Sequence, residues 1–240
     1  MTAKVDITKQ FGAFELDMRF QVPPGVSAIF GPSGAGKTLT LRCIAGLARP
    51  DRGRIVVGER VLFDSAGRVE VPARQRRIGY VFQQYALFPH LDVAANVAYG
   101  LRDRTPTERK GRVEQLLTLI GLTEHAHHYP RMLSGGQQQR VALVRALAPE
   151  PDLVLLDEPF AAVDALTRRQ LRTDLRQLQE RTGVPMLLVT HDLADVQELA
   201  TYVAICEQGR AVQEGPLQEV LSAPSSPGVA ALLNAAGARQ

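Results

Sequence analysis

The segment GPSGAGKT, residues 31–38, constrains the fold of this 240-residue chain more than any other feature. It matches the pattern G-x-x-x-x-G-K-[ST] and stands between an apolar run, VSAIF, and a helical pattern, LTLRCIAGLA. In that setting glycines let backbone N–H groups close around phosphate oxygens at the start of a helix. Lys37 is expected to contact the β and γ phosphates of ATP, and the Thr38 hydroxyl to ligate Mg²⁺. The predicted ATP-binding residues are Gly31, Pro32, Ser33, Gly34, Ala35, Gly36, Lys37 and Thr38.

Two later apolar runs also end in polar residues. LVLL is followed by Asp157 and Glu158, and MLLVT is followed by His191. Continuous apolar runs are typical of parallel strands covered on both faces. Antiparallel strands are expected within residues 4–30, and the pattern is helical from about Val93 to Leu147. The sequence therefore predicts an α/β fold: a P-loop core with a mostly parallel sheet, an N-terminal antiparallel β-subdomain and a helical subdomain.

The composition fits one large soluble domain. Charged residues make up 22% and hydrophobic residues 45% of the chain, which are ordinary values for a globular protein. The net charge of +3 is spread along the sequence, so charge alone does not favour nucleic acid as a partner. No stretch reaches the ~18 apolar residues of a spanning helix. Cys43 and Cys206 stand in apolar segments and suit reduced, buried thiols, which indicates a cytoplasmic protein.

The two acids after LVLL suit metal binding and proton transfer. Asp157 ends a buried strand, where P-loop ATPases place a carboxylate that holds Mg²⁺ directly or through water. Glu158 follows it, and a second carboxylate beside the metal can orient or deprotonate an attacking water. We expect Asp157 to serve as a magnesium ligand and Glu158 as the catalytic base.

The string LSGGQ predicts a second anion-binding loop. It comes directly before QQRVALVRALA, an amphipathic helix. Its anion contacts are expected from Ser134, Gly135, Gly136 and Gln137 at the start of that helix. One ATP does not need two such loops from one chain. A head-to-tail homodimer, with each ATP between the P-loop of one subunit and the LSGGQ of the other, explains both loops.

The P-loop, LSGGQ, LLDEP and VTHD, in that order, resemble the ABC ATPase family over nearly the whole chain. The resemblance implies that Gln83 in YVFQQ contacts Mg²⁺ and water and takes part in catalysis. It implies that Phe11 stacks on adenine and that His191 acts as the switch histidine near the γ phosphate. Asp164 in AAVDA is similar to the D-loop at the dimer interface, although Val163 stands where leucine is commoner.

The resemblance also implies one ABC ATPase domain over residues 1–240. Its core with the antiparallel β-subdomain is expected at about 1–92 and 148–221, and its helical subdomain at about 93–147. The tail 222–240 reads as a weak Ala-rich helix with a poorly ordered end.

Two clusters have alternative interpretations. His125, His127 and His128 can bind a transition metal, or they can belong to the variable surface of the helical subdomain. The apolar stretch Tyr85–Val93 can be core, or it can line the groove that receives a coupling helix of a membrane subunit.

The resemblance favours the motor subunit of an importer. There are no fused membrane helices as in exporters, and HYPRM rather than an acidic, glycine-containing segment precedes LSGGQ. The implied partners are integral membrane permease subunits and, indirectly, a substrate-binding protein, which places the chain on the inner face of the membrane. The alternative is an ABC ATPase that acts on nucleic acid, but no long coiled coil separates Lys37 from Ser134. An inactive relative is disfavoured because the elements for hydrolysis are present.

The segment from Val61 to Arg102 is similar to subunits of molybdate or tungstate importers. Sulfate, ferric-iron and polyamine importers are the alternatives. Many such subunits carry a further C-terminal β-barrel domain, and the chain is either naturally short or truncated before one.

Overall fold

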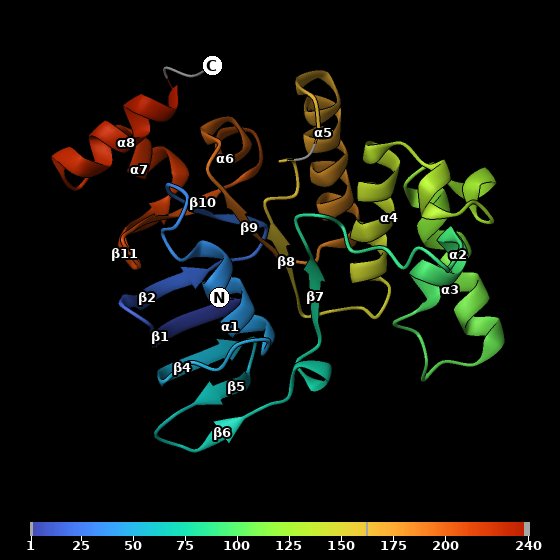
Figure 1. Ribbon diagram of the computed structural model, residues 1–240, viewed down its shortest axis with the longest axis horizontal. Coiled ribbons are helices and arrows are strands. Elements are labelled where there is room, and N and C mark those ends of the chain that lie inside the picture. The colour runs from blue at the N-terminus through green and yellow to red at the C-terminus, as the bar shows by residue number, and fades with distance from the viewer. Residues whose placement is uncertain (1, 162, 238–240) are drawn as a thin grey trace.

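A single twisted sheet runs through the molecule. The computed structural model describes residues 2–161 and 163–237, and in these residues eleven strands form one sheet in the order β6-β5-β4-β1-β2-β11-β10-β3-β9-β8-β7 (Figure 1). The strands are β1 (Ala3–Phe11), β2 (Phe14–Val22), β3 (Val26–Phe30), β4 (Arg52–Val57), β5 (Arg60–Asp64), β6 (Val69–Glu70), β7 (Ile78–Val81), β8 (Leu153–Asp157), β9 (Met186–Thr190), β10 (Tyr202–Glu207) and β11 (Arg210–Pro216).

The strands β10, β3, β9, β8 and β7 are parallel to one another. Every residue of β3, β8 and β9 is buried, as their continuous apolar runs predict. Alternate side chains of β3 face opposite sides. Ile29 packs in the cluster with Leu41 of α1 (Lys37–Ala45), whereas Phe30 packs in the cluster with Val196 of α6 (Leu193–Leu199). Helices on both faces thus bury this part of the sheet, and the carboxyl ends of its strands form one edge.

The N-terminal strands form the antiparallel part. β1 pairs with β2 and with β4, and β5 pairs with β4 and with β6. β11 joins the two parts, because it pairs antiparallel with β10 and meets β2 at Arg210 and Asp17. The predicted α/β fold is confirmed, with one addition: the antiparallel strands extend the parallel sheet instead of forming a separate layer.

The helices between β7 and β8 lie together beside the sheet (Figure 1). α2 begins at Val93 and α4 ends at Leu147, where the sequence predicts the helical stretch to begin and end. The helices are α1 (Lys37–Ala45), α2 (Val93–Ala98), α3 (Pro106–Leu119), α4 (Gly135–Leu147), α5 (Ala165–Thr182), α6 (Leu193–Leu199), α7 (Leu217–Ser222) and α8 (Pro227–Gly237).

Polar side chains fix the helix ends that matter for the site. Thr105 and Ser134 begin α3 and α4 with capping boxes, in which the cap side chain and a Glu or Gln three residues later satisfy each other's backbone N–H. α1 ends at Gly46, which has a φ of 77°. The buried Arg76 guanidinium donates to the carbonyls of Cys43 and Ile44 in the last turn, so the C-terminal end of α1 is held in place.

The C-terminal residues form the helix that the sequence predicts. α8 packs against α6, and its Leu233 is buried. The last residues of the predicted tail 222–240, from 238 on, lie outside the described residues. Cys43 and Cys206 are buried free thiols, as predicted. No helix among the described residues is long and apolar enough to span a membrane.

Candidate nucleotide-binding site

The loop between β3 and α1 needs glycine at three positions. Gly34 and Gly36 have φ values of 82° and 93°, which glycine adopts without steric cost. A Cβ on Gly31 would lie 2.1 Å from the Cys206 carbonyl oxygen, and a Cβ on Gly36 would lie 2.5 Å from a methyl group of Leu16. The loop therefore presses against β10 on one side and β2 on the other.

Strand β10 and the turn that follows it hold this loop by two hydrogen bonds. The Cys206 Sγ donates to the Ala35 carbonyl at 2.9 Å, and the Gly209 N–H donates to the same oxygen at 3.2 Å. Burial raises the pKa of Cys206 to about 11, so the thiol keeps its proton and remains a donor. The sequence identifies Cys206 only as a buried thiol, since its contact with the loop depends on the order of the strands.

The Lys37 side chain lies inside the loop. Its Nζ donates to the carbonyls of Gly31 and Pro32 at 2.8 and 2.9 Å. Burial lowers the pKa of Lys37, and the carboxylates of Glu158 and Asp157 oppose that effect. The Lys37 ammonium is held in place by backbone carbonyls and is largely shielded from water. Its charge is therefore suited to bind phosphate oxygens.

Asp157 gathers two hydroxyl groups at the end of β8. Its Oδ1 accepts from the Thr38 hydroxyl at 2.7 Å, and its Oδ2 accepts from the Tyr80 hydroxyl at 2.9 Å. Burial and the bond to Asp157 raise the pKa of Tyr80, so it stays a donor. A carboxylate beside a threonine hydroxyl provides the hard oxygen ligands that Mg²⁺ prefers, so the residues fit the metal. Tyr80 of β7 was not predicted.

Glu158 and His191 meet at the ends of β8 and β9. The Glu158 carboxylate lies 3.1 Å from the His191 Nδ1, with the Glu158 side chain 18% exposed and the His191 side chain 51% exposed. Glu158 has a φ of 44°, a strained value for a residue other than glycine and one that clusters at active sites. The structure thus brings Lys37, Thr38, Asp157, Glu158 and His191 to the same edge of the sheet.

A buried charge cluster lies behind His191. Arg172 of α5 donates to Asp195 at 2.7 Å and to Glu198 at 2.9 Å. Asp195 also accepts from the Thr190 hydroxyl at 2.7 Å, and Thr190 directly precedes His191. This cluster connects the position of α5 to the strand end that carries His191. The sequence reading missed it, because its members are spread over two helices and a strand.

An open groove leads from the loop toward the C-terminal helix. Its volume is about 710 Å³, and it extends from Gly31–Ser33 past His191 to Leu232 of α8. The groove therefore opens the first residues of the loop and His191 to the outside of the chain.

The LSGGQ segment lies at the start of α4, next to α5. Ser134 caps α4, and a Cβ on Gly136 would touch Thr167 at 3.3 Å, within the first turn of α5. Asp164 caps α5 by accepting from the Thr167 N–H, a bond that lowers the Asp164 pKa. The LSGGQ residues Ser134–Gln137, called the signature below, and Asp164 are thus neighbours. No hydrogen bond among the described residues joins the LSGGQ segment to the P-loop of the same chain.

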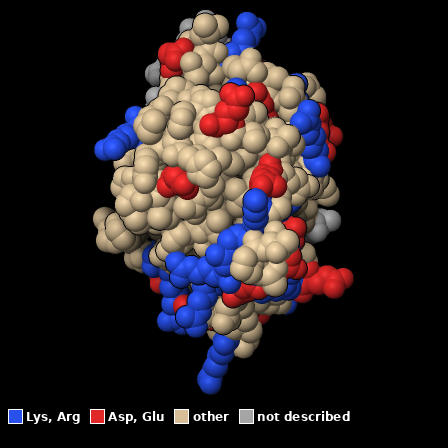
Figure 2. Space-filling view, turned by 90° about the vertical axis from the view of Figure 1, so that its right-hand side faces the viewer, with Lys and Arg blue, Asp and Glu red and all other residues tan. Residues whose placement is uncertain are grey.

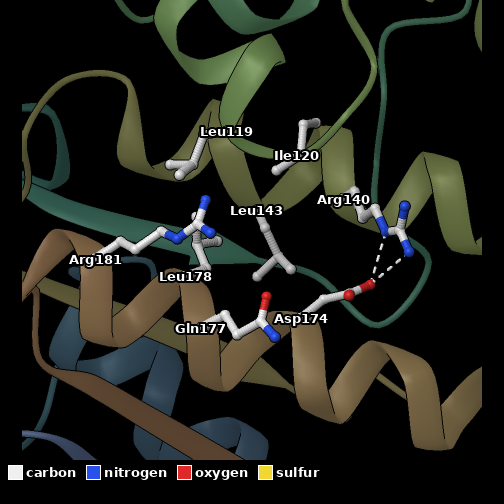
Figure 3. A pocket seen from close by; sticks show the side chains of 8 residues that line it. All are labelled: Leu119, Ile120, Arg140, Leu143, Asp174, Gln177, Leu178 and Arg181. Carbon is white, nitrogen blue, oxygen red and sulfur yellow. Dashed lines mark hydrogen bonds and ion pairs between the residues drawn. The ribbon is translucent and has the colours of Figure 1, made fainter.

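An ion pair in which two guanidinium nitrogens bind one carboxylate oxygen ties α4 to α5. Arg140 of α4 binds Asp174 of α5 at 2.7 and 2.6 Å, beside a cavity of about 80 Å³ (Figure 3). Leu143 and Leu178 line this cavity from the two helices. The helix that begins with the signature and the helix that begins with Asp164 are therefore packed as one unit.

Two predicted residues stand apart from this group. Phe11 ends β1 with 67% of its surface exposed, which leaves its ring free to stack. Gln83 is exposed two residues after β7, and no described residue forms a hydrogen bond with its side chain. Their predicted roles in adenine binding and in catalysis stay predictions.

The histidine cluster does not assemble a set of metal ligands. Among the residues that the structure describes, no group of three or more His, Cys, Asp or Glu side chains is placed to hold a metal. The His125 and His128 rings pack edge to face at 4.9 Å, while the exposed His127 lies 3.5 Å from Asp92.

The stretch Tyr85–Val93 forms a structured loop on the surface. Asn96 is buried and bonds the backbone of Phe88, Leu91 and Asp92. Arg145 donates to the carbonyls of Tyr85 and Ala86. Phe88 stacks on the half-exposed Tyr99 at 4.2 Å. On the side of the molecule with α2 and α3, a mostly uncharged area with scattered acidic side chains lies above a band of basic side chains (Figure 2).

The family model for ABC transporters matches residues 16–161. The sulfate/thiosulfate import ATP-binding protein of Synechocystis sp. is 44% identical over 227 residues, which is 92% of this chain and 62% of that protein. The molybdenum import ATP-binding protein of Rhodospirillum rubrum is 41% identical over 95% of this chain and 61% of that protein. The chain therefore spans about three fifths of the length of these curated relatives.

Solved structures agree with the sequence comparison. A dimeric ATP-binding cassette in a post-hydrolysis state, bound to ADP and Pi, superimposes with a TM-score of 0.74 at 30% identity, over 90% of this chain and 99% of that one. The cbiO1 protein of Clostridium perfringens, part of an ABC transporter complex, gives a TM-score of 0.80 at 27% identity, over 92% of this chain and 90% of that one. With a P-loop, a paired Glu158 and His191, and a capped LSGGQ helix on this fold, the chain belongs to the ABC transporter family.

Proposed function

We propose that this chain binds ATP with Mg²⁺ and hydrolyses it as the motor subunit of an importer. The observation that carries the proposal is the Glu158–His191 pair beside the Lys37 loop, at the edge where the parallel strands end. A carboxylate with an exposed histidine partner, next to a phosphate-binding loop, is suited to accept a proton from a water that attacks the γ phosphate.

Each residue of this edge then has one role. The loop N–H groups and Lys37 bind the phosphates, Glu158 takes the proton from water, and His191 orients Glu158 and the γ phosphate. Thr38 and Asp157, with Gln83, would hold Mg²⁺, which when bound neutralises charge on the phosphate oxygens. Phe11 would stack on adenine.

The second phosphate-binding loop supports a homodimer. In one chain the LSGGQ segment packs against α5 and makes no bond to the P-loop among the described residues. In a head-to-tail pair, Ser134–Gln137 of one subunit would complete the site of the other, with Asp164 at the interface. The related cassette that was solved as a dimer with ADP and Pi is consistent with this arrangement.

The surface around Tyr85–Val93 supports a permease partner. Asn96 and Arg145 bond the backbone of this loop, and Phe88 packs on the ring of the half-exposed Tyr99. Such a preformed apolar surface suits a helix of a membrane subunit. The chain would then sit on the inner face of the membrane through its permease, and a substrate-binding protein would act with the assembled complex.

The transported substrate is proposed as an inorganic oxyanion. The relatives named above carry sulfate/thiosulfate and molybdenum in their names, and these alternatives stay equal. Molybdate or tungstate remains the finer prediction from the sequence.

A mixing experiment tests the shared site. In a homodimer of Lys37→Ala or of Ser134→Arg, both sites are incomplete. In the mixed dimer, one site combines an intact P-loop with an intact signature. We expect ATPase activity, or a nucleotide-trapped mixed dimer, to return on mixing, and wild-type specific activity to rise with protein concentration. A wild-type rate per molecule that stays constant on dilution to a monomer would refute the shared site.

A further inference from the structure

The Gln137 side chain in the signature connects two neighbours. Its Oε1 lies 2.9 Å from the Ser134 backbone N–H, while the Gln137 N–H donates to the Ser134 Oγ at 3.3 Å. A backbone N–H can only donate, so the amide atom that faces it has to be the oxygen. The other end of the Gln137 amide is therefore the NH₂ group, which is a donor.

That NH₂ group faces a histidine. The Gln137 Nε2 lies 3.2 Å from the Nε2 of His125, in the 3₁₀ turn Thr123–His125. Because the amide nitrogen donates, the His125 Nε2 has to accept, and it can accept only in the neutral imidazole with the proton on Nδ1. The His125 Nδ1 is itself buried and has no hydrogen-bond partner in the described structure.

Protonation of His125 conflicts with this arrangement. The imidazolium has two N–H donors, so its Nε2–H would face the NH₂ donor of Gln137. The amide has to rotate or move away, and in either case the Ser134 N–H loses its acceptor and the capping box opens. The other titratable groups around this turn are Glu124, His128, whose ring lies 4.9 Å away, and the Asp92–His127 pair at the start of α2.

We propose that His125 is a positioning residue for the signature motif, and that it holds the Ser134–Gln137 cap in shape only while its imidazole is neutral. Under the proposed function, on which this inference rests, the shaped cap meets the ATP bound by the other subunit. Turnover would then decrease in acid because a histidine outside the phosphate site releases the signature loop.

Three variants separate this role from others. His125→Gln keeps an acceptor near the position of Nε2 but does not titrate in this range. His125→Leu removes the acceptor. His127→Gln is the matched control, because it makes the same substitution two residues away at a side chain that is 92% exposed and faces Asp92.

The first readout needs no ATP. In nucleotide-free protein, the ¹H–¹⁵N NMR signals of the Ser134 and Gln137 amides should move between about pH 8 and pH 5.5, the range over which imidazoles titrate. They should move in the wild type and in His127→Gln, but stay in place in His125→Gln. Amide signals that move equally in wild type and His125→Gln would overturn the inference.

The second readout is turnover at saturating Mg-ATP. Wild type and His125→Gln should have equal rates near pH 8, and wild type should be about fivefold slower near pH 5.5, the effect of losing one helix cap. His125→Leu should be slower at both pH values, while His127→Gln should follow wild type. A constant ratio of wild type to His125→Gln over this range would contradict the role of His125. If the wild type lacks ATPase activity altogether, the proposed function fails, and the NMR experiment still decides the inference.

Discussion

Replacing Arg172 with methionine should destabilise the chain strongly and in a pH-dependent way. The Arg172 side chain is 9% exposed and the Asp195 side chain 5% exposed. Without Arg172, the Asp195 carboxylate keeps the Thr190 hydroxyl as a partner but has lost the positive charge that compensates it. Breaking a buried ion pair in this way costs about 3–5 kcal/mol of unfolding free energy.

The pH dependence follows from Asp195. Burial raises the pKa of Asp195, and Arg172 opposes that shift, so removing Arg172 raises the pKa further. An acid with a raised pKa in the folded state destabilises that state when it is ionised, above its pKa in the unfolded chain. The loss in Arg172→Met should therefore be largest at pH 7–8 and shrink as the pH falls and Asp195 takes up a proton.

Urea unfolding at about pH 8 and pH 5.5 measures this difference. Arg176→Met is the matched control, because Arg176 is exposed on the same helix and should change the unfolding free energy by less than about 0.5 kcal/mol. Adding Asp195→Asn to Arg172→Met should recover part of the loss. Equal losses for Arg172→Met and Arg176→Met, or a loss that does not change with pH, would refute the reasoning.

Three further changes test the site and its surroundings. Glu158→Gln should retain ATP binding but lose nearly all turnover and trap the dimer in size-exclusion chromatography with Mg-ATP; wild-type turnover would remove Glu158 from the base role. Gly31→Ala should weaken ATP binding at least about tenfold, since its Cβ meets the Cys206 carbonyl. The control Gly111→Ala has open space in α3 and should leave ATP affinity unchanged while raising the unfolding free energy by about 0.5–1 kcal/mol. Equal ATP affinities of the two variants would contradict this. Asn96→Ala should raise the rate of amide hydrogen exchange over residues 85–92 but not in β8. Unchanged exchange rates would show that Asn96 does not stabilise the loop.

Local patterns predict much of the fold and of the site. The apolar runs before Gly31, Asp157 and His191 identify three parallel strands, and their carboxyl ends bring these residues to one edge. The capping box of Ser134 and Gln137 is likewise visible within four residues of sequence.

Contacts that depend on strand order are not visible in the same way. Cys206 touches the loop of Ala35 because β10 lies beside β3, and Tyr80 reaches Asp157 because β7 lies beside β8. A tyrosine in a short strand and a single buried cysteine occur in many proteins without such contacts, so their local sequence does not reveal these roles. Their roles come from long-range pairing, which hydrophobic periodicity does not encode.

The continuous sheet bears on the order in which a nucleotide and a second subunit arrive. The strand that ends at Phe11 and the strand that leads into the Gly31 loop belong to the same hydrogen-bonded sheet. Under the proposed function, the adenine site at Phe11 and the phosphate site at the Gly31 loop therefore keep a fixed spacing in a single subunit. ATP should bind a single subunit first and gain part of its binding free energy there. The rest of that free energy should be gained only when the second subunit binds. The midpoint of dimer formation should accordingly shift with ATP concentration as expected for two nucleotides per dimer.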